Sequence, residues 1–170
     1  MEQHKTKITS RSISQSGLPQ DYKKAIAEYI WNGFDARASL IELNYNSNEI
    51  GHISDFSITD NGDGIRIETI DETFGFFLDS QKSSTFDNDG FIKGKKGKGR
   101  FSFSLFANRA VWQTRFTTEE KTVLQYDITI NKSSQDNFGI NNKIVLKHSR
   151  TGTTVFFEDI HSLTSDLLER

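Results

Sequence analysis

Three side chains within one short segment could together handle a metal ion and an attacking water. Glu28, Asn32 and Asp35 follow one another at steps of four and three residues, so on a helix they project from nearly one face. A carboxylate beside a polarised water acts as a general base, and an amide oxygen is a ligand that Mg²⁺ accepts. The simpler interpretation is a solvated helix face, and the three residues taken alone favour it.

A glycine-containing turn carries the second candidate site. The run Asp60-Asn61-Gly62-Asp63-Gly64 directly follows a segment with the alternating pattern of a strand. An Asp at a strand end can accept a hydrogen bond from an amino group on a heterocycle, and glycines let the backbone approach a ligand. Asn-Gly and Asp-Gly also suit an ordinary hairpin turn, so both interpretations stay open at this point.

The third candidate is a basic, glycine-rich run, Gly94-Lys95-Lys96-Gly97-Lys98-Gly99-Arg100. Closely spaced glycines expose backbone N–H groups, which together with positive charge favour phosphate. The run is not a Walker A loop, because no Gly-Lys-Ser/Thr closes it, and it follows a loop where a dinucleotide-binding fingerprint would follow a strand. A surface loop and a nucleic-acid contact are the alternatives.

Hydrophobic periodicity indicates the elements that must position these motifs. Apolar residues at three- and four-residue steps predict a helix from Tyr22 to about Arg37, which starts near Gln20 or Asp21. A second helix is expected over about 67–74 and a third from Ser162, whereas 79–100 has no pattern. Segment 101–107 suits either a strand or a helix, and Gly139 with Asn141-Asn142 marks a turn. The expected strands are 39–46, 53–59, 109–117, 122–131, 143–148 and 153–157.

Composition restricts the class of protein. The 170 residues suggest one domain, and 14 Phe argue against disorder. The absence of Cys excludes a disulfide framework and a thiolate nucleophile, and the four His lack metal-ligand spacing. A net charge of −2 gives no general attraction to nucleic acid. No run approaches the ~18 apolar residues of a membrane span, so we expect a cytoplasmic protein with no membrane partner. Trp31 and Trp112 are expected in the core.

A fourth motif near the end, Thr151-Gly152-Thr153-Thr154-Val155, completes a pattern. In order and spacing the four motifs resemble the GHKL superfamily, the ATPases of the Bergerat fold that include DNA gyrase B, Hsp90, histidine kinases and MutL. Residues 28–36 resemble its E-x-x-x-N-x-x-D-A box, Asp60–Ile65 its D-x-G-x-G box and Gly94–Gly99 its G-x-x-G-x-G box. The resemblance covers roughly residues 20–160. It implies an α+β fold, a two-layer sandwich with a mixed, mostly antiparallel sheet and helices on one face.

The resemblance also implies roles for individual residues. Asp60 would accept from the adenine amino group, directly and through a water shared with Thr153, while Gly62 and Gly64 close around base and sugar. Asn32 would ligate Mg²⁺, and Glu28 would deprotonate the attacking water. Asp35 would have a structural role, and residues 79–100 would form an ATP lid. The phosphates would be held by Gly97 and Gly99, with side chains chosen from Lys96, Lys98 and Arg100.

Glu28 also indicates the branch of the superfamily. Histidine kinases typically carry a second Asn at this position, so the box resembles the hydrolysing gyrase–Hsp90–MutL–MORC branch. The motifs Asp60-Asn61-Gly62-Asp63-Gly64 and Gly152-Thr153-Thr154-Val155 resemble MutL and MORC-type members somewhat more than gyrase. Arg100-Phe101 departs from Hsp90 and MutL and resembles uncharacterised prokaryotic members with G-x-K-G-x-G-R-F. This departure leaves the biological role open.

The expected domain organisation and function follow from this resemblance. Residues 1–20 would be an arm or strand, 21–160 the ATP-binding domain and 161–170 the start of a connection to a further C-terminal domain, which usually supplies a Lys to the γ-phosphate. The domain would bind ATP, hydrolyse it with Mg²⁺ and act as a conformational or dimerisation switch. Its expected partner is a second copy of the full-length protein, in an ATP-dependent homodimer. The alternatives are a nucleotide-binding switch without significant hydrolysis and a nucleic-acid-binding module that uses Lys93–Arg100.

Overall fold

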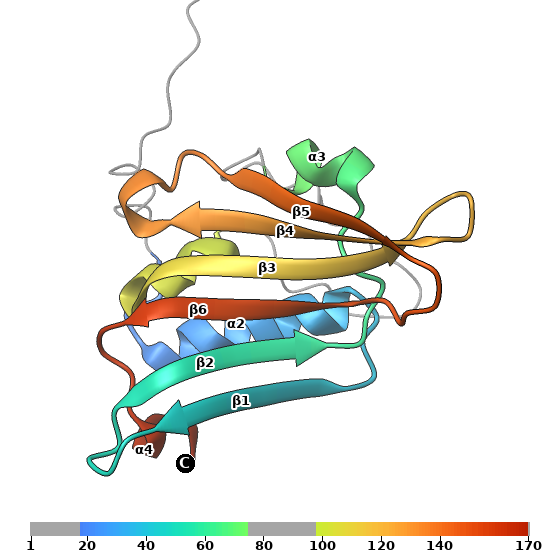
Figure 1. The fold of residues 1–170 in the computed structure, drawn as a ribbon. Helices are drawn as coiled ribbons and strands as arrows, with labels where there is room; N and C mark the ends of the chain where they lie inside the picture. The colour runs from blue at the N-terminus through green and yellow to red at the C-terminus, as the bar shows by residue number, and fades with distance from the viewer. Residues whose placement is uncertain (1–17, 75–97, 170) are drawn as a thin grey trace, which may run out of the picture.

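The fold is one antiparallel sheet with helices on one of its faces, seen in a computed structural model that describes residues 18–74 and 98–169 (Figure 1). The sheet has six strands in the order β1-β2-β6-β3-β4-β5, and every neighbouring pair is antiparallel. The last strand along the chain therefore enters the middle of the sheet, between β2 and β3. The strands are β1 (Ile41–Ser47), β2 (Ile53–Asp60), β3 (Ala107–Thr117), β4 (Val123–Asn131), β5 (Gly139–Leu146) and β6 (Gly152–Ile160).

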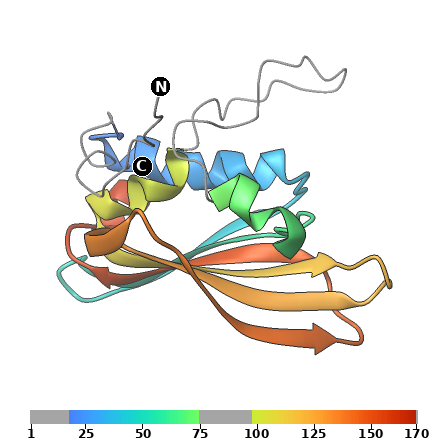
Figure 2. The same cartoon turned by 90° about the horizontal axis from the view of Figure 1, so that it is seen from above.

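The helices form the second layer. Figure 2 shows α2 (Tyr22–Asp35) and α3 (Ile70–Phe74) above the same face of the sheet. Short 3₁₀ helices span Ile67–Thr69, Gly99–Leu105 and Lys132–Ser134, and α4 spans Ser165–Leu168. The expected two-layer α+β sandwich with helices on one face is confirmed, with a sheet that is wholly antiparallel among the described strands.

Local sequence explains where α2 starts and which way it faces. Asp21 is its N-cap, and the Asp21 carboxylate accepts hydrogen bonds from the backbone N–H groups of Lys23 and Lys24 at 2.8 and 3.1 Å. The residues that α2 buries against the sheet are Ala25, Ile26, Tyr29 and Gly33, at helical spacing. The predicted helix from Tyr22 is therefore confirmed, two residues shorter at its end.

Aromatic rings join the two layers. Phe157 on β6 lies 4.9 Å from the Tyr29 ring of α2, 5.0 Å from Phe106 and 5.1 Å from Phe56, measured between ring centroids. Trp112 is buried in the same core, as expected. Trp31 is 42% exposed on α2, so the expectation that it belongs to the core was wrong.

Several expected boundaries are corrected by tertiary structure. Strand β5 starts at Gly139, earlier than the expected residue 143. The turn expected near Asn142 is instead a bulge within the strand, where Asn142 adopts a positive φ of 53°. Strand β6 runs on to Ile160, beyond the expected 153–157. The last helix is confined to Ser165–Leu168, since the backbone N–H of Ile53 binds the Leu163 carbonyl and the Leu163 side chain is buried. Segment 101–107 is resolved as a 3₁₀ helix that leads into β3.

Residues 1–17 of the expected arm over 1–20, and residues 79–97 of the expected lid over 79–100, lie outside the described residues. Within the described part, no helix has the length and apolar character needed to cross a membrane.

Candidate functional site

Three polar side chains meet across neighbouring strands on the helix-covered side of the sheet. Asp60 on β2 is the register partner of Thr153 on β6, and Thr153 is the register partner of Thr114 on β3. The hydroxyl oxygens of Thr114 and Thr153 are 3.0 Å apart, and both residues are buried. Two residues from separate predicted motifs, Asp60 and Thr153, are thus brought side by side.

The Asp60 carboxylate is held by backbone donors. Its Oδ1 accepts from the N–H of Gly62 at 2.8 Å and from the N–H of Thr153 at 3.3 Å. Burial raises the pKa of Asp60 above its ordinary value, and the two backbone hydrogen bonds offset only part of this effect. No ion pair neutralises this carboxylate among the described side chains, so its second oxygen is suited to accept from a ligand.

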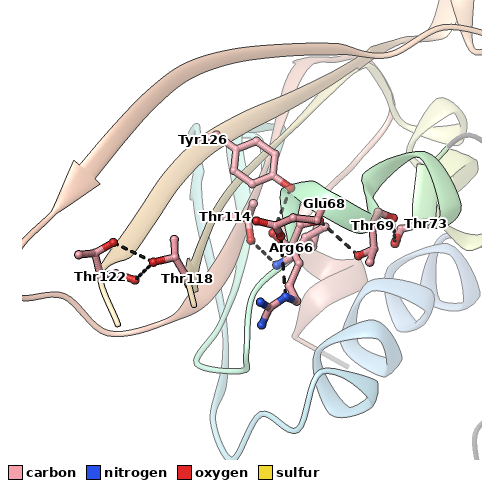
Figure 3. Close-up of polar contacts among 9 residues, drawn as sticks. Arg66, Glu68, Thr69, Thr73, Thr114, Thr118, Thr122 and Tyr126 are labelled. Atoms are coloured by element: carbon pink, nitrogen blue, oxygen red, sulfur yellow. Dashed lines mark hydrogen bonds and ion pairs between the residues drawn. The ribbon is translucent and has the colours of Figure 1, made fainter. Parts of the chain in front are cut away.

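The turn after Asp60 is fixed to the sheet at Ile65. The backbone N–H of Ile65 donates to Thr114 Oγ1 at 2.8 Å, and Tyr126 on β4 donates from its hydroxyl to the Ile65 carbonyl at 3.0 Å. Figure 3 shows the Thr114 and Tyr126 side chains that make these contacts. Gly64 has a φ of +76°, and a Cβ there would overlap the carbonyl oxygen of Arg115. The glycine is therefore required by the close docking of this turn against β3.

The same turn is tied to the end of α2. Asn61 Oδ1 accepts from the backbone N–H groups of Ser39 and Leu40, each at 2.9 Å. The N–H of Asp63 donates to the Ala36 carbonyl at 2.9 Å, and Arg37 Nε donates to Asp63 Oδ2 at 2.7 Å. These contacts set the D-x-G-x-G box at the C-terminal end of the helix that carries Glu28 and Asn32.

The last glycine of the basic run lies against Glu28. A Cβ at Gly99 would be 2.5 Å from Glu28 Oε2, so a larger residue there would displace the Glu28 carboxylate from this position. Tyr29, the next residue on α2, donates to the Arg100 carbonyl at 3.0 Å and accepts from the N–H of Phe103 at 3.1 Å. Glu28, predicted from one motif, and Gly99, predicted from another, are thus brought together.

Arg100 has a different surrounding from the one expected. It is buried, and its Nη1 and Nη2 donate to the carbonyls of Thr73 and Phe74 at 2.9 and 3.1 Å, at the C-terminal end of α3. Its guanidinium also lies over the ring of Phe101, 4.6 Å from the centroid. Burial lowers the pKa of Arg100 to about 10, so the group remains charged at neutral pH. This placement gives no support to the expected phosphate contact, since main-chain carbonyls take two of its donor groups.

The structure says less about the remaining predicted site residues. Asn32 is exposed, and its side chain makes no hydrogen bond to any other described residue. Lys98 precedes the 3₁₀ helix that starts at Gly99. Gly97 and Lys96 lie outside the described residues. In the described part of the chain, no three acidic or His side chains gather as a ready-made metal site.

Sequence reasoning missed Thr114, Tyr126 and Tyr29. Thr114 occupies an inward position of β3, between Trp112 and Phe116, and a hydroxyl among alternating apolar residues is the signal that it must find a buried partner. Tyr29 was counted only as an apolar position of its helix, and Tyr126 was not singled out within its strand. Their hydroxyls bind backbone groups distant in sequence, which no local pattern indicates.

Comparisons with known proteins agree with this arrangement. Residues 20–159 match the family model described as histidine kinase-, DNA gyrase B-, and HSP90-like ATPase. No curated protein sequence matches the chain significantly.

Two solved structures share the fold. The ATPase region of Saccharomyces cerevisiae topoisomerase II matches 85% of this chain and 41% of its own, with 19% identity and a TM-score of 0.54. The N-terminal domain of a DNA repair protein matches 94% of this chain and 42% of its own, with 19% identity and a TM-score of 0.55. The chain thus spans about two-fifths of the length of these structures. Because the family model covers most of the chain, the protein belongs to the family of histidine kinase-, DNA gyrase B- and HSP90-like ATPases.

Proposed function

We propose that this chain is a domain that binds ATP with Mg²⁺ and hydrolyses it. The observation that carries the proposal is the meeting of separate motifs around α2. Asp60 and Thr153 lie side by side near its end, and Gly99 contacts Glu28 on its middle turn. An adenine base needs a hydrogen-bond acceptor and a donor, and the phosphates need backbone N–H groups. These features lie beside the same helix.

In this proposal Asp60 accepts a hydrogen bond from the adenine amino group, with Thr153 beside it. Gly62 and Gly64 bring the turn backbone close to the base and sugar. Gly97 and Gly99 offer backbone N–H groups to the phosphates, and Lys96 and Lys98 offer positive charge. Arg100 has a positioning role, because its guanidinium binds the end of α3.

The proposed metal ligand on the protein is Asn32. Its carboxamide has no hydrogen-bond partner among the described side chains, so its oxygen is available to a cation. Mg²⁺ usually keeps several waters and takes one or two protein ligands together with substrate phosphates. The lack of an acidic cluster among the described residues fits an ion that arrives with the nucleotide. Bound there, Mg²⁺ would neutralise charge on the phosphates.

Hydrolysis is assigned to Glu28. From its place against Gly99, the carboxylate can orient a water and take a proton from it as the water attacks the terminal phosphate. Catalysis of this kind depends mostly on positioning and charge stabilisation. Binding and hydrolysis would drive a conformational or dimerisation switch in a larger protein. A switch with negligible hydrolysis is the alternative, and Glu28 variants distinguish the two.

The experiment that tests binding uses Asp60→Asn, with Asp55→Asn as its control. Asp55 lies on the same strand but outside the motif, where it accepts from Ser54 Oγ at 2.8 Å. Loss of a hydrogen bond to a charged group is worth roughly 1.5–3 kcal/mol, or ~10- to 150-fold in affinity. Calorimetry with MgATP should show this loss for Asp60→Asn and no change for Asp55→Asn. Equal affinities for both variants and the parent would remove Asp60 from the site.

A further inference from the structure

A pair of buried hydroxyls beside Asp60 has only one hydrogen-bond direction that satisfies both. Thr114 is fully buried, and its Oγ1 has two partners, the N–H of Ile65 at 2.8 Å and Thr153 Oγ1 at 3.0 Å. An amide N–H can only donate, so the Thr114 oxygen accepts from Ile65. The remaining Thr114 proton then has Thr153 as its acceptor. The reverse direction would leave a buried O–H proton with no acceptor, which is disfavoured.

This direction makes Thr153 a donor to whatever lies beyond it. Once the Thr153 oxygen accepts from Thr114, its own proton is free to donate. Asp60, the cross-strand neighbour of Thr153, carries a carboxylate, which can only accept. Two backbone N–H groups already bind its Oδ1, so Oδ2 remains to accept from a ligand. The site therefore presents an acceptor and a donor next to each other.

We propose that Thr114 is a positioning residue that determines base specificity by fixing the hydrogen-bond direction of Thr153. The inference rests on the proposed function and deepens it. Adenine offers an amino donor next to a ring nitrogen acceptor, which complements Asp60 and Thr153 in that order. Hypoxanthine and guanine carry a carbonyl acceptor and a ring N–H donor at the same two positions, so both contacts are mismatched. A water between Thr153 and the base keeps the direction, because after accepting from Thr153 it has two protons to donate.

The experiment compares the affinities for MgATP and MgITP, measured by calorimetry, in the parent and three variants. Thr114→Val removes the hydroxyl, and Thr114→Ser retains it. Thr154→Val is the matched control, because Thr154 lies next to Thr153 on β6 and forms its own hydroxyl pair at 3.1 Å with Thr59 on β2, on the opposite face of the sheet. Thr114→Val should reduce the preference for ATP over ITP by roughly 10-fold. Thr114→Ser and Thr154→Val should keep the preference of the parent.

A change in packing alone would weaken both nucleotides equally, and that result for Thr114→Val would overturn the inference while leaving the proposed function intact. If the parent binds neither nucleotide, the proposed function fails and the inference fails with it.

A second measurement needs no variant. The triphosphate of 1-deazaadenosine lacks the ring acceptor, so it should bind the parent roughly 10-fold more weakly than ATP. Equal binding of this analogue would overturn the donor role of Thr153 even if Thr114→Val does not fold.

Discussion

At the scale of single residues, Asp60 illustrates a conflict between folding and binding. Its carboxylate is half-buried, receives two backbone N–H groups and has a pKa above the ordinary value because of burial. A charge that is poorly solvated and has no ion-pair partner among the described residues destabilises the folded state. The same feature strengthens a hydrogen bond from a ligand donor, since fewer waters compete for the carboxylate.

Asp60→Asn should therefore raise the thermal stability of the free protein at neutral pH. In the parent the folded-state pKa is raised, so the contribution of Asp60 to stability is greatest below the unfolded pKa of about 3.9 and is lost as pH rises through the folded value. The variant has no such loss. Its advantage in melting temperature should be largest near pH 7 and shrink toward pH 4. A variant that melts below the parent at pH 7 would contradict this account.

Glu28 should separate chemistry from binding. Because it lies against Gly99 and outside the Asp60–Thr153 pair, Glu28→Ala should keep MgATP affinity and slow hydrolysis by roughly 10²–10⁴-fold. Glu28→Gln keeps the shape and should be slowed to the same extent. Glu42→Gln, on the exposed edge strand β1, is the control. Turnover is measured on the longest natural form of the protein, since the proposed switch acts in a larger protein. A parental rate in Glu28→Ala would exclude the general-base role.

At the scale of elements, the 3₁₀ helix over Gly99–Leu105 depends on contacts to two other helices. Ser102 Oγ donates to the Ala25 carbonyl of α2 at 3.0 Å, and Tyr29 binds the same turn at two backbone groups. Arg100 reaches the opposite way, to the last carbonyls of α3. Gly99 is thus placed beside Glu28 by its neighbours along the chain.

Replacing Arg100 should test this role. Arg100→Lys keeps the charge but cannot donate to two carbonyls in a plane, and it should lose roughly 1.5–3 kcal/mol of unfolding free energy, the worth of one hydrogen bond to a charged group. Urea unfolding measures the loss. Arg66→Lys is the control, because that exposed side chain is 3.8 Å from Glu68 and surface substitutions change stability by about 0.5 kcal/mol or less. If the two variants lose equal stability, the hydrogen bonds from Arg100 to α3 contribute no more to the unfolding free energy than an exposed surface contact does.

The elements also show which parts of the fold the sequence could indicate. Helix α2 was predictable because its apolar spacing and its Asp21 cap are both local signals. The bulge at Asn142 was not, because its amide donates to Asp127, a partner on the neighbouring strand, at 2.6 Å. Arg100 was a candidate phosphate partner because it closes a basic, glycine-rich run that resembles a phosphate-binding box. Its burial depends on α3, which the sequence pattern does not connect to it.

At the scale of the whole molecule, one aromatic cluster holds the site-bearing helix on the sheet. Phe157 contacts Tyr29 of α2 as well as Phe56 and Phe106, and it is nearly fully buried. It lies on the same strand as Thr153, four residues further along. The strand that contributes to the proposed base contact is thus also the strand that anchors the core.

Phe157→Ala should therefore lower the unfolding free energy by about 3–5 kcal/mol, the usual cost of removing a buried Phe, without removing any proposed ligand contact. If the site survives, a nucleotide at 100 times its dissociation constant should restore about 2.7 kcal/mol, in the variant and the parent alike, because it binds only the folded state.

Chelation of Mg²⁺ with EDTA should reduce this gain in both proteins, since Asn32 is proposed to act through the metal. Urea unfolding with and without MgATP measures each quantity. A gain in the parent but none in the variant would show that the cluster shapes the site itself, and a gain unchanged by EDTA would remove Mg²⁺ from the proposed complex.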